Sequence, residues 1–213
     1  MSWPDLESVI MQTIRETSLV LWAAFFLLVL YIFLAAKENI FCWPVGIAGS
    51  ILSVAVYFSE NYPFEAWLNI CYALLGFYGW FEWQKGRKKN VEVDSGPSDK
   101  PIVNMRPKHL VIALFCGAAG ALFLGFIGSE ITASAKPWAD ASIASFSLLA
   151  TWMTAKKYIE NWLFWIVTNA GAAVLYFATG PRMYVFALLF LLYTFMSVAG
   201  YFSWRIIQKR SGA

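Results

Sequence analysis

Seven long stretches without a charged side chain divide this sequence, and each is apolar enough to lie in the hydrocarbon core of a membrane. About 20 mostly apolar helical residues span a bilayer core of about 30 Å. Five stretches reach that length, and the other two extend at one end through Glu82 or Asp140, each with tryptophan nearby. Only 14% of the residues are charged, against about 25% in soluble domains. We predict an all-α integral membrane protein with seven transmembrane helices, in residues 17–36, 39–59, 66–81, 109–129, 141–154, 161–181 and 183–204.

The polar composition argues against several classes of function. The net charge is only +3, and the basic residues are segregated by side of the predicted membrane rather than gathered on a nucleic-acid-binding face, so we expect no nucleic-acid partner. Cys42, Cys71 and Cys116 lie in apolar stretches without the spacing of a zinc site or a disulfide framework. His109 is the sole histidine, and no Asp or Glu lies at the middle of a stretch. We therefore expect no enzyme activity, cofactor, metal or proton relay, although a sodium site of backbone carbonyls would leave no such trace.

Lysine and arginine set the expected orientation, because cytoplasmic loops of membrane proteins are enriched in them. With seven spans, thirteen of the sixteen Lys and Arg residues fall on one side of the membrane. That side becomes the cytoplasm, so the N-terminus is outside and the C-terminus inside. Residues 1–16 lack the basic start of a signal peptide, and Leu6, Ile10 and Ile14 share one helical face, which predicts a short interfacial helix.

An internal repeat relates the first three predicted spans to the last three. Glu38-Asn39, Trp43 and Gly49 recur as Glu160-Asn161, Trp165 and Gly171, at an offset of 122. A second cluster recurs at an offset of 121, with Tyr72, Gly79, Phe81 and Trp83 matching Tyr193, Gly200, Phe202 and Trp204.

An even number of crossings separates the two copies, which therefore share one orientation in the membrane. Such a 3+1+3 parallel repeat is one of the transporter architectures, with the substrate site between the halves, although a duplicated scaffold without transport would give the same pattern. We expect an interfacial segment at 1–16, a first three-helix repeat at 17–84, a basic cytoplasmic linker at 85–108, a linker helix at 109–130, a second repeat at 138–206 and a cytoplasmic tail at 207–213.

The sixth predicted span carries a polar and aromatic stripe. Trp162, Trp165, Asn169 and Tyr176 recur at intervals that place them on one helical face. Asn169 lies about 12 Å beyond Asn161, close to the middle of the membrane. Such a carboxamide needs a hydrogen bond, either to a neighbouring helix or to a ligand, and the tryptophans favour the ligand. Trp162 is also suited to the membrane interface.

Two motifs resemble the PnuC family of bacterial vitamin transporters: FYGWFEW at 77–83 and KYIENWLFW at 157–165. The resemblance implies a transporter for nicotinamide riboside, related in architecture to the sugar-carrying SWEET proteins. Transport would be facilitated diffusion across the bacterial inner membrane, with cytoplasmic ribosylnicotinamide kinase trapping the substrate. It also implies that Trp162, Trp165 and Asn169 bind substrate. Asn69 stands where the family pattern has Gln, and Ala199 where an Asn is sometimes present.

The residues favour this class of substrate without selecting one vitamin. A flat pyridinium or thiazolium cation is attracted to a tryptophan face, and Trp162 and Trp165 suit either. Asn169 complements a carboxamide, and ribose hydroxyls have partners in Asn69, Ser147 or Thr194. A thiamine carrier and a non-transporting scaffold or sensor subunit stay open as alternatives, as does assembly into a homo-oligomer.

Overall fold

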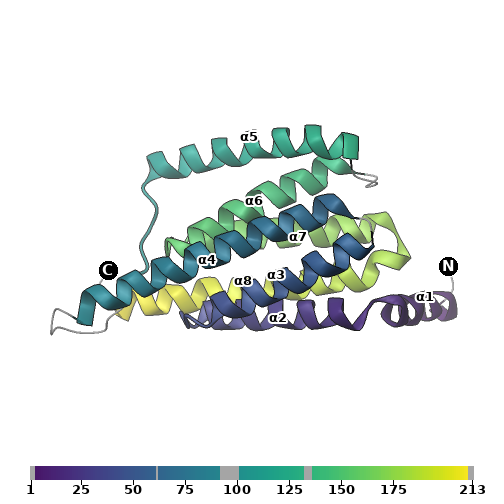
Figure 1. Cartoon of the computed structure of the whole chain (residues 1–213), viewed down its shortest axis with the longest axis horizontal. Helices are drawn as coiled ribbons and strands as arrows, with labels where there is room; N and C mark the ends of the chain where they lie inside the picture. The colour runs from purple at the N-terminus through teal and green to yellow at the C-terminus, as the bar shows by residue number, and fades with distance from the viewer. Residues whose placement is uncertain (1–2, 61, 92–100, 132–135, 211–213) are drawn as a thin grey trace.

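The computed structural model describes residues 3–60, 62–91, 101–131 and 136–210. Within these ranges the chain is helical, and Figure 1 shows the helices gathered into one elongated bundle. The elements are α1 (Trp3–Glu16), α2 (Leu19–Ala36), α3 (Cys42–Ser59), α4 (Pro63–Val91), α5 (Pro107–Ile131), α6 (Pro137–Ala155), α7 (Asn161–Thr179), the 3-10 turn η1 (Pro181–Met183) and α8 (Tyr184–Arg210).

Local sequence signals fix where several helices begin and end. Proline opens α4, α5 and α6, because its ring presets the helical φ angle and the first helical residue has no N–H partner to lose. Ser18 caps α2, since its hydroxyl accepts a hydrogen bond from the Leu21 N–H at 3.2 Å. Gly180 ends α7 at a φ of 125°, which a residue with a side chain rarely adopts.

Among the described residues, five helices are long and apolar enough to cross a membrane, namely α2, α3, α5, α7 and α8. They correspond, within a few residues at their ends, to the five stretches that the sequence predicts to be long enough, so this prediction is confirmed. The two shorter stretches also lie in helices, α4 and α6. The chain is therefore an all-α, multi-pass membrane protein.

The helices pack as two groups of three. In the first group α3 lies between α2 and α4, and in the second α7 packs against both α6 and α8. The groups meet at two places, where the last helix of each group packs against the first helix of the other: α4 contacts α6, and α8 contacts α2. The remaining long helix, α5, packs along α6 at the edge of the bundle (Figure 1). Helix α1 lies beyond the N-terminal end of α2, where it contacts η1 and α8.

The turn after α2 has the same backbone structure as the turn after α6. The N–H of Glu38 donates to the Ala35 carbonyl at 3.0 Å, and the N–H of Lys157 donates to the Thr154 carbonyl at 3.0 Å. Both turn residues have left-handed backbone angles, with φ of 54° at Glu38 and 60° at Lys157. The offset between the two turns is thus 119 residues (157 minus 38).

This offset corrects the sequence alignment of the first cluster, which used 122. Trp43 is the second residue of α3 as Trp162 is the second residue of α7, and each N–H donates to the carbonyl three residues earlier at 3.2 Å. Trp43 therefore corresponds to Trp162, and not to Trp165. Sequence comparison missed this because a three-residue slip is almost one helical turn and leaves tryptophan on a similar face.

The second cluster agrees with the structure at its offset of 121. In each half a tryptophan ring lies directly over a glycine of the last helix, and a methyl group at that glycine would overlap the ring. The same ring meets a second tryptophan edge to face, with 5.5 Å between ring centroids. The matching sets are Trp43, Trp83 and Gly79 in the first half and Trp162, Trp204 and Gly200 in the second.

Both ends of the expected polar linker belong to the folded structure of the bundle. Helix α4 continues past the predicted boundary at 84, and residues 101–105, called the strap here, lie across the turn between α6 and α7. The N–H of Val103 donates to the Lys157 carbonyl, and the N–H of Ile159 donates to the Val103 carbonyl, both at 3.1 Å. Ile102 in the strap is buried in the main core. The remaining linker residues, 92–100, lie outside the described residues.

Candidate functional site

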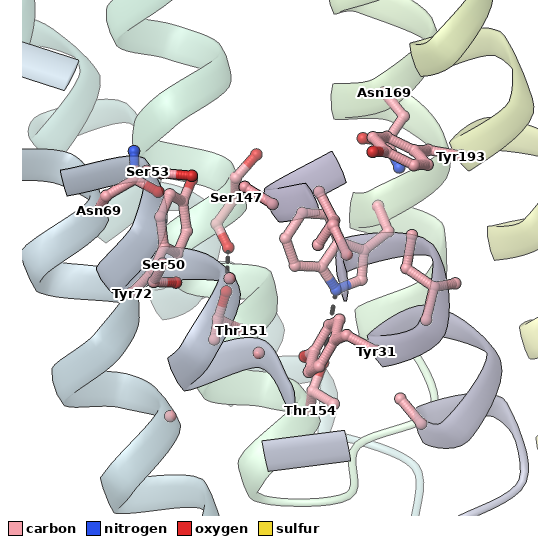
Figure 2. A pocket seen from close by; sticks show the side chains of 18 of the residues that line it. Tyr31, Ser50, Ser53, Asn69, Tyr72, Ser147, Thr151, Thr154, Asn169 and Tyr193 are labelled. Atoms are coloured by element: carbon pink, nitrogen blue, oxygen red, sulfur yellow. Dashed lines mark hydrogen bonds between the residues drawn. The ribbon is translucent and has the colours of Figure 1, made fainter. Parts of the chain in front are cut away.

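A cavity of about 260 Å³ lies between the two groups of helices. Its walls come from α2, α3 and α4 of the first group and from α6, α7 and α8 of the second, while α5 contributes nothing. Most of the lining is aliphatic or aromatic, and Figure 2 shows hydroxyl and amide groups distributed around it. None of its described lining residues is Asp, Glu, Lys or Arg. A cavity of this kind suits a small organic ligand that is positioned by a few polar groups.

Five of the seven predicted site residues line this cavity, namely Trp162, Trp165, Asn169, Asn69 and Ser147. The other two, Thr194 and Tyr176, are not in its lining. The Thr194 hydroxyl donates to the carbonyl of Phe190 in its own helix at 2.9 Å, and the Tyr176 ring lies 5.3 Å from the Phe190 ring. Both thus contact Phe190, which does line the cavity.

The two tryptophans of the KYIENWLFW motif have different surroundings. Trp162 is only 2% exposed, and its ring is enclosed by Gly200 and Trp204. Trp165 is half-buried, and its indole N–H donates to the Thr154 hydroxyl at 3.4 Å. Trp162 therefore forms part of the packed wall, whereas Trp165 is the one able to offer a ring face to a ligand.

The two carboxamides of the cavity are held by different helices. Asn169 donates through Nδ2 to the Ser197 hydroxyl of α8 at 3.3 Å, which satisfies part of a side chain that is 5% exposed. This contact is the neighbouring-helix bond that the sequence left as an alternative, and Asn169 lines the cavity as well. Asn69 donates through Nδ2 to the Glu65 carbonyl of its own helix at 2.9 Å. In Figure 2 Asn69 lies with Ser53 and Tyr72, on the opposite side of the view from Asn169.

Sequence reasoning missed several polar groups of the lining. The pair Tyr72 and Tyr193 was visible as a repeat match, and both side chains line the cavity, so this match was an available signal. The others carry no comparable pattern, because their positions depend on which helices are neighbours. They are Tyr31, Ser50, Ser53, Tyr57 and Ser197. Thr151 and Thr154 also line the cavity, and the sequence indicates them through the hydroxyl-rich stretch at 141–154, which favours either close helix packing or a pathway lining.

Equivalent positions of the two halves line the cavity with different chemistry. Asn69 corresponds to Phe190 at the offset of 121 of the last helices. The cavity therefore has similar walls but unlike polar groups on its two sides, which suits an unsymmetrical ligand. At the offset of 119, the pairs are Ala35 and Thr154, Gly46 and Trp165, and Ser50 and Asn169.

Two ion pairs lie at one end of the bundle, called the basic end here: the turns after α2 and α6 together with the C-terminal parts of α4 and α8. The Lys157 ammonium lies 2.8 Å from the Glu38 carboxylate and 4.7 Å from the centre of the Trp83 ring. The Lys156 ammonium lies 3.2 Å from the Glu82 carboxylate. Hydrogen bonds with Tyr78 and then Glu82 raise the pKa of Lys156, so its ammonium stays charged at neutral pH.

Known proteins are similar to this chain in sequence and in fold. The model of the family described as nicotinamide mononucleotide transporter matches residues 18–206. The nicotinamide riboside transporter PnuC of Escherichia coli (strain K12) is 23% identical over 198 residues, which cover 84% of this chain and 82% of that protein. The riboflavin/roseoflavin transporter RibM of Streptomyces davaonensis is 23% identical over 180 residues, 83% of this chain and 80% of that protein.

A crystal structure of the vitamin B3 transporter PnuC has the same fold. The two structures superpose with a TM-score of 0.70 at 20% identity, over 96% of this chain and 88% of the other. The family model covers all the helices that line the cavity, from α2 to α8. On this evidence the chain belongs to the nicotinamide mononucleotide transporter family.

Proposed function

We propose that this protein carries nicotinamide riboside across the bacterial inner membrane by facilitated diffusion. The observation that carries the proposal is the uncharged, aromatic cavity between two helix groups, with Trp165 and Asn169 in its lining. The relatives named nicotinamide riboside transporters support the choice of cargo. Because the family consists of transporters, we propose translocation without a chemical step.

The cavity suits a flat organic cation. The pyridinium ring of nicotinamide riboside has no carboxylate to meet in the lining, so aromatic faces have to provide the attraction. A desolvated cation–π contact stabilises such a ring by up to about 2 kcal/mol, and Trp165 is the candidate. We assign the carboxamide of the cargo to Asn169 and its ribose hydroxyls to Asn69 and Ser147.

The same lining selects against the phosphorylated form of this cargo. A phosphate group carries about −1.5 to −2 charges at neutral pH, and burial of such a charge is strongly unfavourable without a cationic partner. No Lys or Arg lines the cavity among the described residues. We therefore propose that the riboside crosses and the mononucleotide does not. Phosphorylation by a cytoplasmic ribosylnicotinamide kinase would then retain the imported cargo in the cell.

The proposed topology has seven spans in a 3+1+3 arrangement, with the segment boundaries predicted from the sequence. The reciprocal contacts of α4 with α6 and of α8 with α2 support two equivalent halves. The matching turns at Glu38 and Lys157 support a parallel repeat, because both lie at the basic end. We place the basic end in the cytoplasm because thirteen of the sixteen Lys and Arg residues fall on that side.

Transport without a coupling ion is part of the same proposal. A coupling ion must bind one conformation of the carrier better than the other, and intramembrane carboxylates are the typical proton-binding groups of pumps and transporters. Glu82 and Asp140 both lie outside the cavity lining. We therefore propose a uniporter, driven only by the cargo gradient.

Calorimetric titration of the purified protein with four ligands tests the choice of cargo. We expect nicotinamide riboside to bind, and nicotinamide mononucleotide to bind at least tenfold more weakly. Thiamine and riboflavin should also bind more weakly than nicotinamide riboside. Riboflavin belongs in the panel because the relative RibM carries it, and its neutral fused rings gain no cation–π attraction. Preferential binding of riboflavin or thiamine would contradict nicotinamide riboside as the cargo, and the protein would still be proposed as a transporter. A scaffold or sensor subunit would instead give no saturable uptake in liposomes.

A further inference from the structure

Trp165 is held by a hydroxyl group from the preceding helix. Its indole N–H donates to Thr154 Oγ1 at 3.4 Å, and Figure 2 marks this bond beside the labelled Thr154 and Tyr31. Thr154 lies in the last turn of α6 and is 1% exposed. The bond therefore joins the cavity tryptophan of α7 to the end of α6.

The Thr154 hydroxyl is itself held in place by two acceptors. Its oxygen lies 2.8 Å from the Ala150 carbonyl and 3.1 Å from Asn161 Oδ1. A hydroxyl has one proton to donate, and either acceptor can take it, which leaves a lone pair of the oxygen for the indole N–H. Asn161 is also fixed, because its Nδ2 donates to the Tyr158 carbonyl at 2.6 Å. The indole of Trp165 is thus linked through the side chains of Thr154 and Asn161 to the Tyr158 carbonyl, in the turn between α6 and α7.

The other half of the protein has no counterpart of this bond. At the offset of 119 found in the turns, Thr154 corresponds to Ala35 and Trp165 to Gly46. Neither residue has a side chain that could form the contact. If the fold required the bond, the matching half would need an equivalent, yet it packs without one.

We propose that Thr154 is a positioning residue, which sets the plane of the Trp165 ring against the cavity so that a cationic cargo meets its face. This proposal rests on the proposed function, in which Trp165 contacts the cargo. It goes further in assigning the orientation of the ring to one hydroxyl of α6. Asn161 supports that hydroxyl from the first residue of α7.

A double-mutant cycle with binding of nicotinamide riboside tests the proposal. Thr154→Val keeps the shape and removes the acceptor, and we expect it to weaken binding roughly three- to tenfold, the range of one buried hydrogen bond. Thr154→Ser restores the acceptor and should bind within about twofold of the wild type. Thr179→Val is the control, because the Thr179 hydroxyl also lies on α7, donates to the Leu175 carbonyl of its own helix at 2.8 Å and lies outside the lining. In a Trp165→Ala background, Thr154→Val should have no further effect.

A second measurement separates this inference from the choice of binding site. In protein labelled with 5-fluorotryptophan, the fluorine NMR signal missing from Trp165→Phe identifies Trp165. We expect Thr154→Val to shift that signal without added cargo, and Thr179→Val to leave it in place. An unshifted signal, or an equal loss of affinity in the Trp165→Ala background, would overturn the positioning role. A shifted signal together with unchanged affinity in Trp165→Ala would instead remove Trp165 from the cargo site and keep its link to Thr154.

Discussion

Glu38 and Lys157 occupy the same position in two matching turns, and their side chains form an ion pair at 2.8 Å. Both residues have a left-handed backbone, and the Lys157 side chain is only 2% exposed. The two halves are thus joined at the basic end by residues that the repeat makes equivalent in structure but opposite in charge. We expect an opening of the cavity toward this end to separate them.

Breaking this pair from one side should destabilise the protein. Lys157→Met leaves the Glu38 carboxylate without its partner in a largely buried place, and removal of one partner of a buried pair costs about 3 kcal/mol or more. We expect a clear drop in melting temperature in detergent. The exchanged pair, Glu38→Lys with Lys157→Glu, should recover much of the loss. Lys156→Met is the control, since its pair with Glu82 is more exposed and should contribute about 1 kcal/mol or less.

Gly200 should tolerate no larger side chain. A methyl group there overlaps the Trp162 ring, which is itself enclosed by Trp204, so Gly200→Ala should lower stability by about 1–3 kcal/mol. Gly171→Ala is a matched control, because nothing lies within 4 Å of the added methyl group. Equal melting temperatures for the two variants would contradict the described packing of the second half.

Trp165→Ala should weaken binding of nicotinamide riboside by roughly 1–3 kcal/mol, through loss of stacking and cation–π attraction. Titration calorimetry on the purified variant measures this. Trp67→Ala serves as control, since Trp67 is 60% exposed on α4 and lies outside the cavity lining. Identical affinities in wild type and Trp165→Ala would exclude this ring from the site.

Single cysteines test the proposed orientation. In a background without Cys42, Cys71 and Cys116, Lys108→Cys should resist a membrane-impermeant thiol reagent in intact cells, because it lies at the basic end. Lys136→Cys, at the opposite end of the bundle, should react. The reverse labelling pattern would place the N-terminus in the cytoplasm and exchange every inward and outward assignment.

The sequence was sufficient for five membrane-spanning helices but not for the faces that these helices turn to the cavity. Hydropathy identified α2, α3, α5, α7 and α8, because membrane helices need long uncharged stretches. The stripe on α7 correctly brought Trp165 and Asn169 to one cavity. Thr194 could not be assigned in this way, since α8 is apolar on most of its faces and its inward side depends on its neighbours.

The contribution of the first half was the harder part to predict. Tyr31 and Ser50 reach the cavity because α2 and α3 face α7 and α8 across the bundle, and no spacing within α2 or α3 reveals that arrangement. The register of the repeat failed for a related reason. A slip of three residues preserves the helix face, so only the hydrogen bonds of the turns distinguish an offset of 119 from 122.

Uptake of labelled nicotinamide riboside into liposomes that contain only this protein tests the central claim most directly. We expect saturable entry until the inside and outside concentrations are equal, whether or not a proton or sodium gradient is imposed. Accumulation should appear only when ribosylnicotinamide kinase and ATP are enclosed. Absence of protein-dependent entry, or concentration well above the external level that collapses with an imposed gradient, would contradict a facilitator with an uncharged cavity.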